Sequence, residues 1–143
     1  MSSPILPDIE DPETRGFWDA AREGQLVVQQ CTQCGHLRFP PHPGCPVCRG
    51  LSAAWKAVSG RAHLWSFIIV HGPTLPTFQK FVPFPVGVVS LIEAPHLRMV
   101  GNLIAAPGAP LNSVDSSNLR IDMPLVVTFL QMDGVALPCW IPQ

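Results

Sequence analysis

The sequence predicts a mostly β protein in which one short N-terminal helix precedes a metal-binding module and a small antiparallel barrel. Three observations lead to this prediction. Four of the five cysteines form two closely spaced pairs, the 143 residues include 17 prolines and 11 glycines, and the chain beyond residue 55 alternates β-prone runs with turn residues. A hydrophobic fraction of 47% is enough for a globular core, which excludes a disordered chain.

A short helix is predicted over residues 12–23. Asp11 is expected as its N-cap, Pro12 suits the first helical position, and Gly24 follows the last turn.

Two large aromatic residues, Phe17 and Trp18, form a narrow apolar stripe on this otherwise charged helix. They are expected either to pack on the chain's own barrel or to anchor a partner protein, and the pattern leaves both alternatives open. A helix of this length is marginal in water by itself, so the aromatic pair must be buried against something.

A metal site is predicted between residues 31 and 48. A two-residue gap lets both thiolates of a turn reach one ion, and two such turns complete a tetrahedron. The expected ligands are Cys31, Cys34, Cys45 and Cys48. Four protein ligands leave no open position, so we expect one structural zinc per chain.

Alternatives to zinc remain at this stage. Iron fits the same four thiolates, and two disulfides would use the same cysteines. His36 or His42 would replace a cysteine only if one thiolate were not used. The fifth cysteine, Cys139, lies in an apolar strand and is expected to pack as a small hydrophobic residue, since no activating base accompanies it.

The barrel is expected from short strands joined by turns with no intervening helix. Before the cysteines, 26–28 is predicted as a strand leading into the metal module. The later predicted strands are 55–70, with a bend near Gly60, and 86–93, 97–104, 125–131 and 135–141. The last two are expected to form a hairpin, because Asp133-Gly134 is a strong two-residue turn signal. The domain boundaries that follow are 1–24 for the arm and helix, 25–54 for the metal module and 55–143 for the barrel.

Charge is segregated along the chain. Residues 1–23 carry −4, residues 24–92 contain no acid and carry +5, and residues 93–143 carry −2. The overall charge of −1 and the lack of a basic run argue against a nucleic-acid-binding protein, which remains the alternative function.

No apolar run is long enough to cross a bilayer, and the polar, acidic start at 1–13 does not have the pattern of a signal peptide. We therefore expect a cytoplasmic protein that makes no use of a membrane. The sequence contains no recognisable nucleophile with a matching base and no phosphate-binding glycine loop. We therefore do not expect this chain to be catalytically active by itself.

The order of motifs resembles the zinc-ribbon/OB-fold proteins associated with acyl-CoA metabolism. The resemblance covers about residues 12–142. Its motifs are Gln29-Gln30-Cys31-x2-Cys34-Gly35, Phe39-Pro40-Pro41, Cys45-Pro46-x-Cys48, Trp55, Ser59-Gly60, Trp65-Ser66-Phe67, Val82-Pro83-Phe84, Val88-x-x-Leu91-Ile92-Glu93 and Ile121-Asp122-Met123-Pro124-Leu125. Two positions depart from the family pattern: Asp122 stands where relatives more often have glycine, and Phe84 where tyrosine is common.

This resemblance implies a rubredoxin-like zinc ribbon beside an OB-fold barrel, in a subunit that binds a thiolase-like enzyme or a hotdog-fold enoyl-CoA hydratase. The catalytic residues would then belong to the partner, for example a thiolase or the thiolase-fold aldolase of steroid side-chain degradation. The basic middle segment suggests contacts to the phosphates of CoA. The candidate residues for these contacts are Arg38, Arg49, Lys56 and Arg61.

Overall fold

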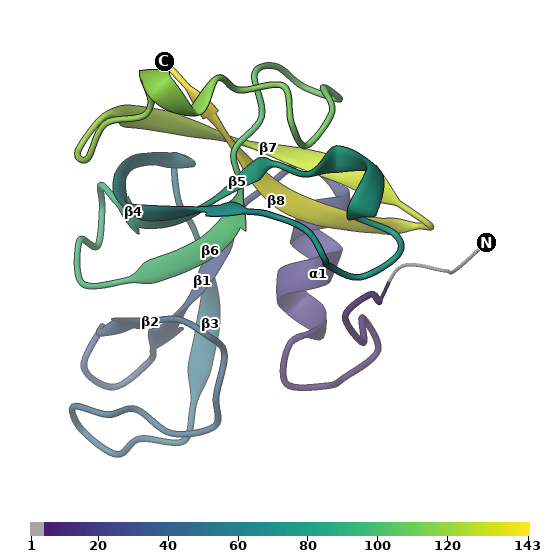
Figure 1. The fold of residues 1–143 in the computed structure, drawn as a ribbon. Helices are drawn as coiled ribbons and strands as arrows, with labels where there is room; N and C mark the ends of the chain where they lie inside the picture. The colour runs from purple at the N-terminus through teal and green to yellow at the C-terminus, as the bar shows by residue number, and fades with distance from the viewer. Residues whose placement is uncertain (1–4) are drawn as a thin grey trace.

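A computed structural model describes residues 5–143, so the first four residues of the expected arm lie outside the description. The elements are α1 (Arg15–Arg22), β1 (Val27–Cys31), β2 (Leu37–Arg38), β3 (Ala53–Ala57), β4 (Arg61–Val70), η1 (Gln79–Phe81), β5 (Phe84–Leu91), β6 (Arg98–Asn102), η2 (Ser116–Asn118), β7 (Pro124–Met132) and β8 (Val135–Pro142). Strands dominate, as predicted. Figure 1 shows β1, β2 and β3 extending below the larger sheet, with α1 beside them. No helix among the described residues is long and apolar enough to cross a membrane.

The three-stranded sheet has the order β2-β1-β3, and both pairs are antiparallel. It carries the cysteine turns and so forms the ribbon. Residue Trp55 pairs with Gln29 in this sheet, so β3 belongs to the ribbon and the sheet extends past residue 54 to Ala57. The chain then bends at residues 58–60 and enters the barrel at β4, where the sequence predicts a bend.

The helix begins later than the sequence predicts, at Arg15 instead of residue 12. The Asp11 carboxylate accepts a hydrogen bond from the Glu13 N–H at 2.9 Å, and the Asp11 carbonyl accepts from Thr14 and Arg15 at 3.1 and 2.8 Å. Asp11 therefore closes a separate turn before the helix and does not act as the N-cap. Thr14 takes that position, without a side-chain hydrogen bond.

The predicted end of the helix is confirmed. Gly24 follows Arg22 and Glu23 with φ +77°, and its N–H donates to the Ala21 carbonyl at 2.9 Å. This left-handed conformation is the usual glycine-based stop of a helix.

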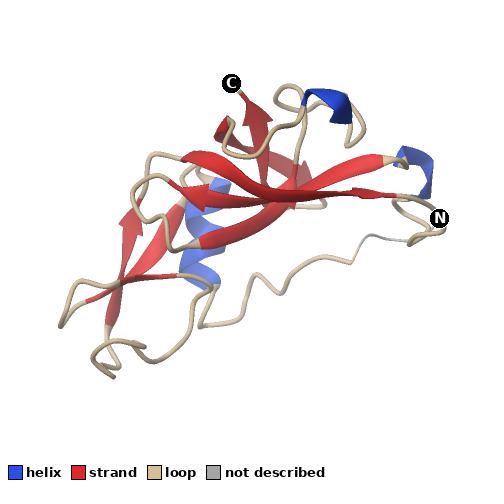
Figure 2. Ribbon diagram, turned by 60° about the vertical axis from the view of Figure 1, so that its left-hand side comes forward, coloured by secondary structure: helices blue, strands red, loops and turns tan. Residues whose placement is uncertain are grey.

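Helix α1 lies against the strands in both ribbon views and contacts β1 and β8 (Figures 1 and 2). Its Phe17 side chain is buried in the main core, with a relative exposure of 5%. Trp18 is only partly buried, and its ring meets Phe17 edge-on with centroids 4.9 Å apart. Phe17 thus packs on the chain's own barrel, which is one of the two alternatives that the sequence left open.

The five-stranded sheet has the order β6-β5-β4-β7-β8 and is antiparallel throughout. It curls so that the chain after β6 meets β8: Leu103 and Trp140 form a parallel bridge, and the Ile104 N–H donates to the Trp140 carbonyl at 3.0 Å. This contact closes the barrel around the fully buried Trp140. The predicted β7–β8 hairpin is confirmed, and β5 and β6 also pair as antiparallel neighbours.

The β7–β8 turn shows why the sequence signal was strong. Asp133 and Gly134 both have positive φ angles, 49° and 83°, the combination that a two-residue hairpin of this twist requires. Asp122 is another non-glycine residue with a positive φ angle, 68°. Its N–H donates to the Leu64 carbonyl at 2.7 Å. A glycine at position 122 would adopt this backbone conformation without strain, which agrees with the glycine that the family resemblance implies there. At the second position that departs from the family pattern, Phe84 is buried in a second core cluster with Ile104.

Gly60 joins the ribbon to the barrel in a conformation that tolerates no side chain. Its φ is +81°, and an added Cβ would lie 2.4 Å from Val127 Cγ1. We expect Gly60→Ala to lower the free energy of unfolding by about 2–5 kcal/mol, because it combines a left-handed alanine with overpacking. The control is Gly108→Ala, where φ is +76° but no atom lies within 4 Å, so only the backbone cost of about 1–2 kcal/mol applies. Urea unfolding measures both variants, and an equal loss of unfolding free energy in the two would contradict this account.

Candidate metal centre and surrounding surfaces

Two tight turns bring the paired cysteines together. In the first, the Gly35 N–H donates to the Cys31 carbonyl at 3.0 Å as β1 ends. In the second, the Arg49 N–H donates to the Cys45 carbonyl at 2.9 Å, and Arg49 itself has φ 65°. Each turn therefore places two thiols on the same side of its loop.

All four sulfur atoms of the predicted ligands lie within 4.8 Å of one another. The Sγ atoms of Cys31 and Cys48 are 3.5 Å apart, and those of Cys34 and Cys45 are 3.6 Å apart. A tetrahedral zinc with bonds of about 2.3 Å separates its sulfurs by about 3.8 Å. The four thiols thus fit one tetrahedral metal ion, and among residues 5–143 they are the one cluster of this kind.

The turns also favour thiolate at part of the site. Backbone hydrogen bonds from Cys34 and Gln33 lower the pKa of Cys31 to about 6, and the backbone of Cys48 lowers the pKa of Cys45. At Cys48 the Gly50 N–H acts in the same direction, but the hydrogen bond with Cys31 and burial raise its pKa to about 12. A cation bound by all four sulfurs would require each thiol to be deprotonated, because metal ligands bind as thiolates.

Neither histidine of the ribbon takes a ligand position. The His36 ring stacks on His96 with centroids 5.1 Å apart, and the backbone of His42 bonds Gln29 and Arg38. The ligand set predicted from the sequence is therefore the one that the structure brings together.

Cys139 lies apart from this cluster, in the second core, with 1% of its surface exposed. Burial raises the pKa of its thiol to about 11, so it is protonated at neutral pH and unsuited to act as a nucleophile. This confirms its expected role as a small hydrophobic residue.

We expect Cys139 to be unreactive toward a disulfide reagent at pH 8 in the folded protein and to react fully once the chain is unfolded in denaturant. The folded pKa is above the value of 9.0 for an unperturbed thiol, so its contribution to stability is present below pH 9 and is lost as the pH rises toward 11. Thiol counting on the metal-loaded protein measures this. Rapid reaction of Cys139 before unfolding would contradict its burial.

The four basic residues proposed to meet phosphates are not equivalent. Arg49, Lys56 and Arg61 are exposed, whereas Arg38 is 3% exposed and hydrogen-bonded within the ribbon. Arg38 lines one cavity and Arg61 another, so no single cavity gathers them. Three of the four candidate residues are therefore exposed at the surface, and Arg38 is not.

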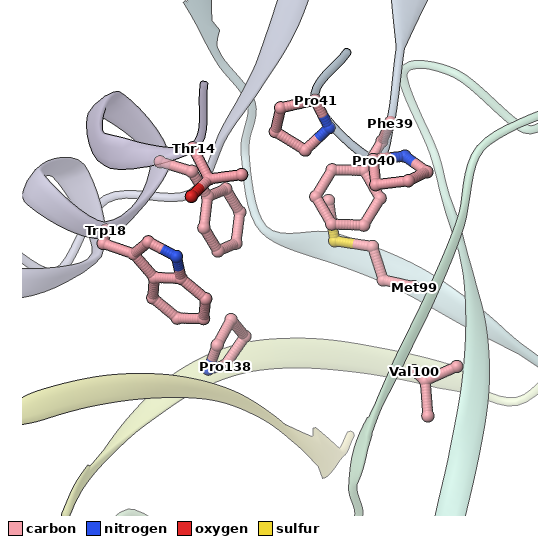
Figure 3. Close-up of a pocket in the computed structure, with 9 residues that line it drawn as sticks. Thr14, Trp18, Phe39, Pro40, Pro41, Met99, Val100 and Pro138 are labelled. Carbon is pink, nitrogen blue, oxygen red and sulfur yellow. The ribbon is translucent and has the colours of Figure 1, made fainter. Parts of the chain in front are cut away.

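An apolar cavity opens where helix, ribbon and barrel meet, and the sequence did not predict it. Figure 3 shows Trp18 and Pro138 on one side of it, facing Phe39 and Met99. Its lining residues are Thr14, Phe17, Trp18, Phe39, Pro40, Pro41, Met99, Val100 and Pro138. No local sequence signal identifies it, because its lining residues come from the helix, the ribbon and the barrel and meet only in the folded chain.

Three large apolar side chains are exposed on strands β4 and β6, and the Arg98 guanidinium stacks on one of them, Trp65, 4.7 Å from the ring centroid. Val100 at the cavity edge is 70% exposed, Trp65 is 53% exposed, and Ile68 is 62% exposed. On strand β5, Val88 pairs with Val100 of β6 on one side and with Ser66 of β4 on the other, so the three strands are neighbours in the sheet. We call Trp18, Val100, Trp65 and Ile68 the apolar face.

Comparison with known proteins places this arrangement in a family. A model described as the ChsH2 rubredoxin-like zinc ribbon domain matches residues 18–52, and one described as the ChsH2 C-terminal OB-fold domain matches residues 55–130. The chain belongs to the ChsH2 family. The resemblance inferred from the sequence motifs is thereby confirmed, as is the order of zinc ribbon and OB-fold barrel.

Relatives of this ChsH2-family chain include subunits of hydratases. It is 33% identical over 128 residues to a Thermomonospora curvata protein named "Probable enoyl-CoA hydratase alpha subunit", which covers 88% of this chain and 36% of the relative. It is 29% identical over 148 residues to the 3-oxo-4,17-pregnadiene-20-carboxyl-CoA hydratase alpha subunit of Mycobacterium tuberculosis, which covers 96% of this chain and 43% of the relative. The chain thus spans less than half the length of these relatives.

A solved structure titled "Ltp2-ChsH2(DUF35) aldolase" contains a similar chain. The two superimpose with a TM-score of 0.79 at 29% identity, over 97% of this chain and 98% of that one. Among shorter matches, a DUF35 domain-containing scaffold protein of Pyrococcus furiosus is 30% identical over 79 residues, which covers 55% of this chain and 57% of the relative. Homologues of this chain are therefore subunits of hydratase and aldolase complexes.

Proposed function

We propose that this chain is a non-catalytic subunit that binds and stabilises a thiolase-like acyl-CoA enzyme in the cytoplasm. The enzyme would be a thiolase or a retro-aldolase, with steroid side chains or other acyl groups as substrates, and the ribbon would hold one structural zinc. The observation that carries this proposal is the match over 97% of the chain to the ChsH2 chain of an aldolase complex. A hotdog-fold hydratase is the second candidate partner, because two relatives are named as hydratase alpha subunits.

The apolar face is the proposed contact with the enzyme. Large exposed aromatic and aliphatic side chains of this kind are common centres of protein interfaces. Trp18 takes the anchoring role proposed for Phe17 and Trp18 together, since Phe17 is buried within the chain. Residues 1–23 carry a net charge of −4, which favours a partner surface with positive charge beside its apolar pocket.

Contact with the CoA thioester is a further part of the proposal. Arg49, Lys56 and Arg61 are exposed and belong to a segment without acids, so they are available to phosphates at the edge of a partner's active site. Arg38 is not part of this group because its guanidinium is buried.

We expect the isolated chain to show no thiolysis, hydration or retro-aldol cleavage of acyl-CoA substrates. The same assays with the proposed partner enzyme should show a gain in the activity or in the half-life of that enzyme when the chain is added. Turnover by the chain alone would contradict the proposal.

The alternative class of function is tested by titration with single-stranded DNA at low salt. Nucleic-acid binding would require affinity that falls steeply with added salt. We expect no saturable binding, because basic residues are few and no basic run occurs. Saturable, salt-dependent binding would favour the nucleic-acid alternative.

A further inference from the structure

The ribbon and the barrel do not share a sheet. Their strands form two separate sheets, β2-β1-β3 and β6-β5-β4-β7-β8. They are joined by α1, by the linker at residues 58–60 and by apolar packing, in which Val28 and Val58 lie in the same core as Leu91 of the barrel. Apolar packing is non-directional, so it keeps two units together without setting the angle between them. Hydrogen bonds between the two units would set that angle.

The turn between β5 and β6 supplies two such contacts. The Glu93 carboxylate accepts a hydrogen bond from the Ser59 N–H of the linker at 2.7 Å. His96 Nε2 donates to the Leu37 carbonyl of β2 at 2.9 Å, and the His96 ring stacks on His36 with centroids 5.1 Å apart. One turn of the barrel thus contacts both the linker and an edge strand of the ribbon.

This turn is itself anchored on the barrel. Its Ala94 and Leu97 side chains are buried, and the Leu97 N–H donates to the Ala94 carbonyl at 2.9 Å. Ser90 Oγ donates to the Pro95 carbonyl at 2.8 Å. The two residues that reach the linker and the ribbon, in contrast, are exposed. The turn therefore has buried residues that fix it to the barrel and exposed residues that hold other parts of the chain.

The linker side of the contact is also ordered. Ser59 Oγ accepts from the Arg61 N–H at 3.2 Å, and the Gly60 carbonyl accepts from the Val127 N–H at 2.8 Å. Burial by itself would raise the pKa of Glu93, but hydrogen bonds from Ser59 and the charge of Arg61 outweigh it and lower that pKa. The linker therefore favours the ionised carboxylate, whose hydrogen bonds are stronger than those of a neutral acceptor.

We propose that the β5–β6 turn is a strap that fixes the orientation of the ribbon on the barrel, with Glu93 and His96 as its two holding points. Without these contacts the ribbon would stay attached through its apolar base but tilt on the linker, because units of one chain move relative to each other by default. Arg49 and Lys56 belong to the ribbon, whereas the apolar face lies on helix and barrel, so the strap also sets how these two surfaces lie relative to one another. The inference concerns the fold and stands or falls independently of the proposed function.

Residual dipolar couplings of the ¹⁵N-labelled, metal-loaded chain measure this orientation. In the natural chain one alignment tensor should fit the amides of the ribbon sheet and of the barrel together. In the double variant Glu93→Ala, His96→Ala the ribbon amides should need a separate, smaller tensor, and the Ser59 amide should exchange with solvent severalfold faster. Both replaced side chains are exposed, so their removal opens no core cavity. If the double variant does not fold, Glu93→Ala alone is measured in its place.

Two further variants isolate the hydrogen bond. Glu93→Gln keeps an oxygen acceptor for the Ser59 N–H and should retain the single tensor. Asp115→Ala removes another exposed carboxylate, which accepts from the Ser117 N–H within its own loop at 2.9 Å, and should retain the single tensor as well.

The strap is rejected if the double variant keeps one tensor for ribbon and barrel, or if the natural chain already needs two. It is also rejected if Glu93→Gln separates the tensors as fully as the double variant, because the hydrogen bond would then not be what fixes the ribbon. Separate tensors in Asp115→Ala would indicate a general loosening of the chain and would equally reject the strap.

Discussion

Replacing Cys45 with serine is expected to release the metal and unfold the ribbon. Structural zinc in small modules contributes about 10–16 kcal/mol of binding free energy, and the two-residue β2 and wholly exposed β3 provide little core to compensate. The purified natural chain should carry close to one zinc, and the variant much less. Metal analysis measures the content, and loss of the amide dispersion of residues 27–57 reports the unfolding.

The matched control is Cys139→Ala, which removes the one cysteine outside the cluster. It should keep a full equivalent of metal and cost only the stability of a small core truncation. A natural chain with less than half an equivalent of any metal and freely titratable thiols would contradict the zinc assignment. A coloured protein that contains iron would support the four-cysteine site but identify its metal as iron instead of zinc.

Replacing Phe17 with alanine is expected to lower the free energy of unfolding by about 3–5 kcal/mol, the usual cost of removing a buried phenyl ring. The ring lies in the main core and contacts Phe39, with centroids 5.5 Å apart, as well as Trp18. Urea unfolding of the isolated chain measures this loss. Binding of the partner per folded molecule should change little.

The neighbouring substitution Trp18→Ala should show the opposite pattern. Trp18 lines the cavity and is only partly buried, so its loss should cost less folding free energy and a few kcal/mol of partner affinity. If Phe17→Ala weakens partner binding by itself while the chain remains as stable as before, the division of roles between the two aromatics is wrong.

Local sequence signals predicted the parts of this fold that depend on local chemistry. The Asp133-Gly134 turn, the helix stop at Gly24 and the cysteine ligand set are each determined by a few adjacent residues. The helix start was misplaced because Asp11 can close a turn of its own as readily as cap a helix.

Features that depend on distant pairing could not be read from the sequence. Trp55 joins the ribbon because β3 pairs with β1, and nothing local separates that strand from the barrel strand that follows. Arg38 looked like a surface cation in a basic segment, yet pairing of β2 with β1 sets it beside Gln29 and buries it. The apolar cavity likewise exists only once helix, ribbon and barrel are assembled.

The most direct test of the central claim is the mass of the complex between this chain and the proposed acyl-CoA enzyme of the same organism, measured by light scattering after size-exclusion chromatography of the mixed proteins. A single hetero-oligomeric peak containing both chains, which is lost with Trp18→Ala while that variant remains folded, is the predicted result. Separate elution of the two proteins at micromolar concentration, with the stability and turnover of the enzyme unchanged by this chain, would contradict it.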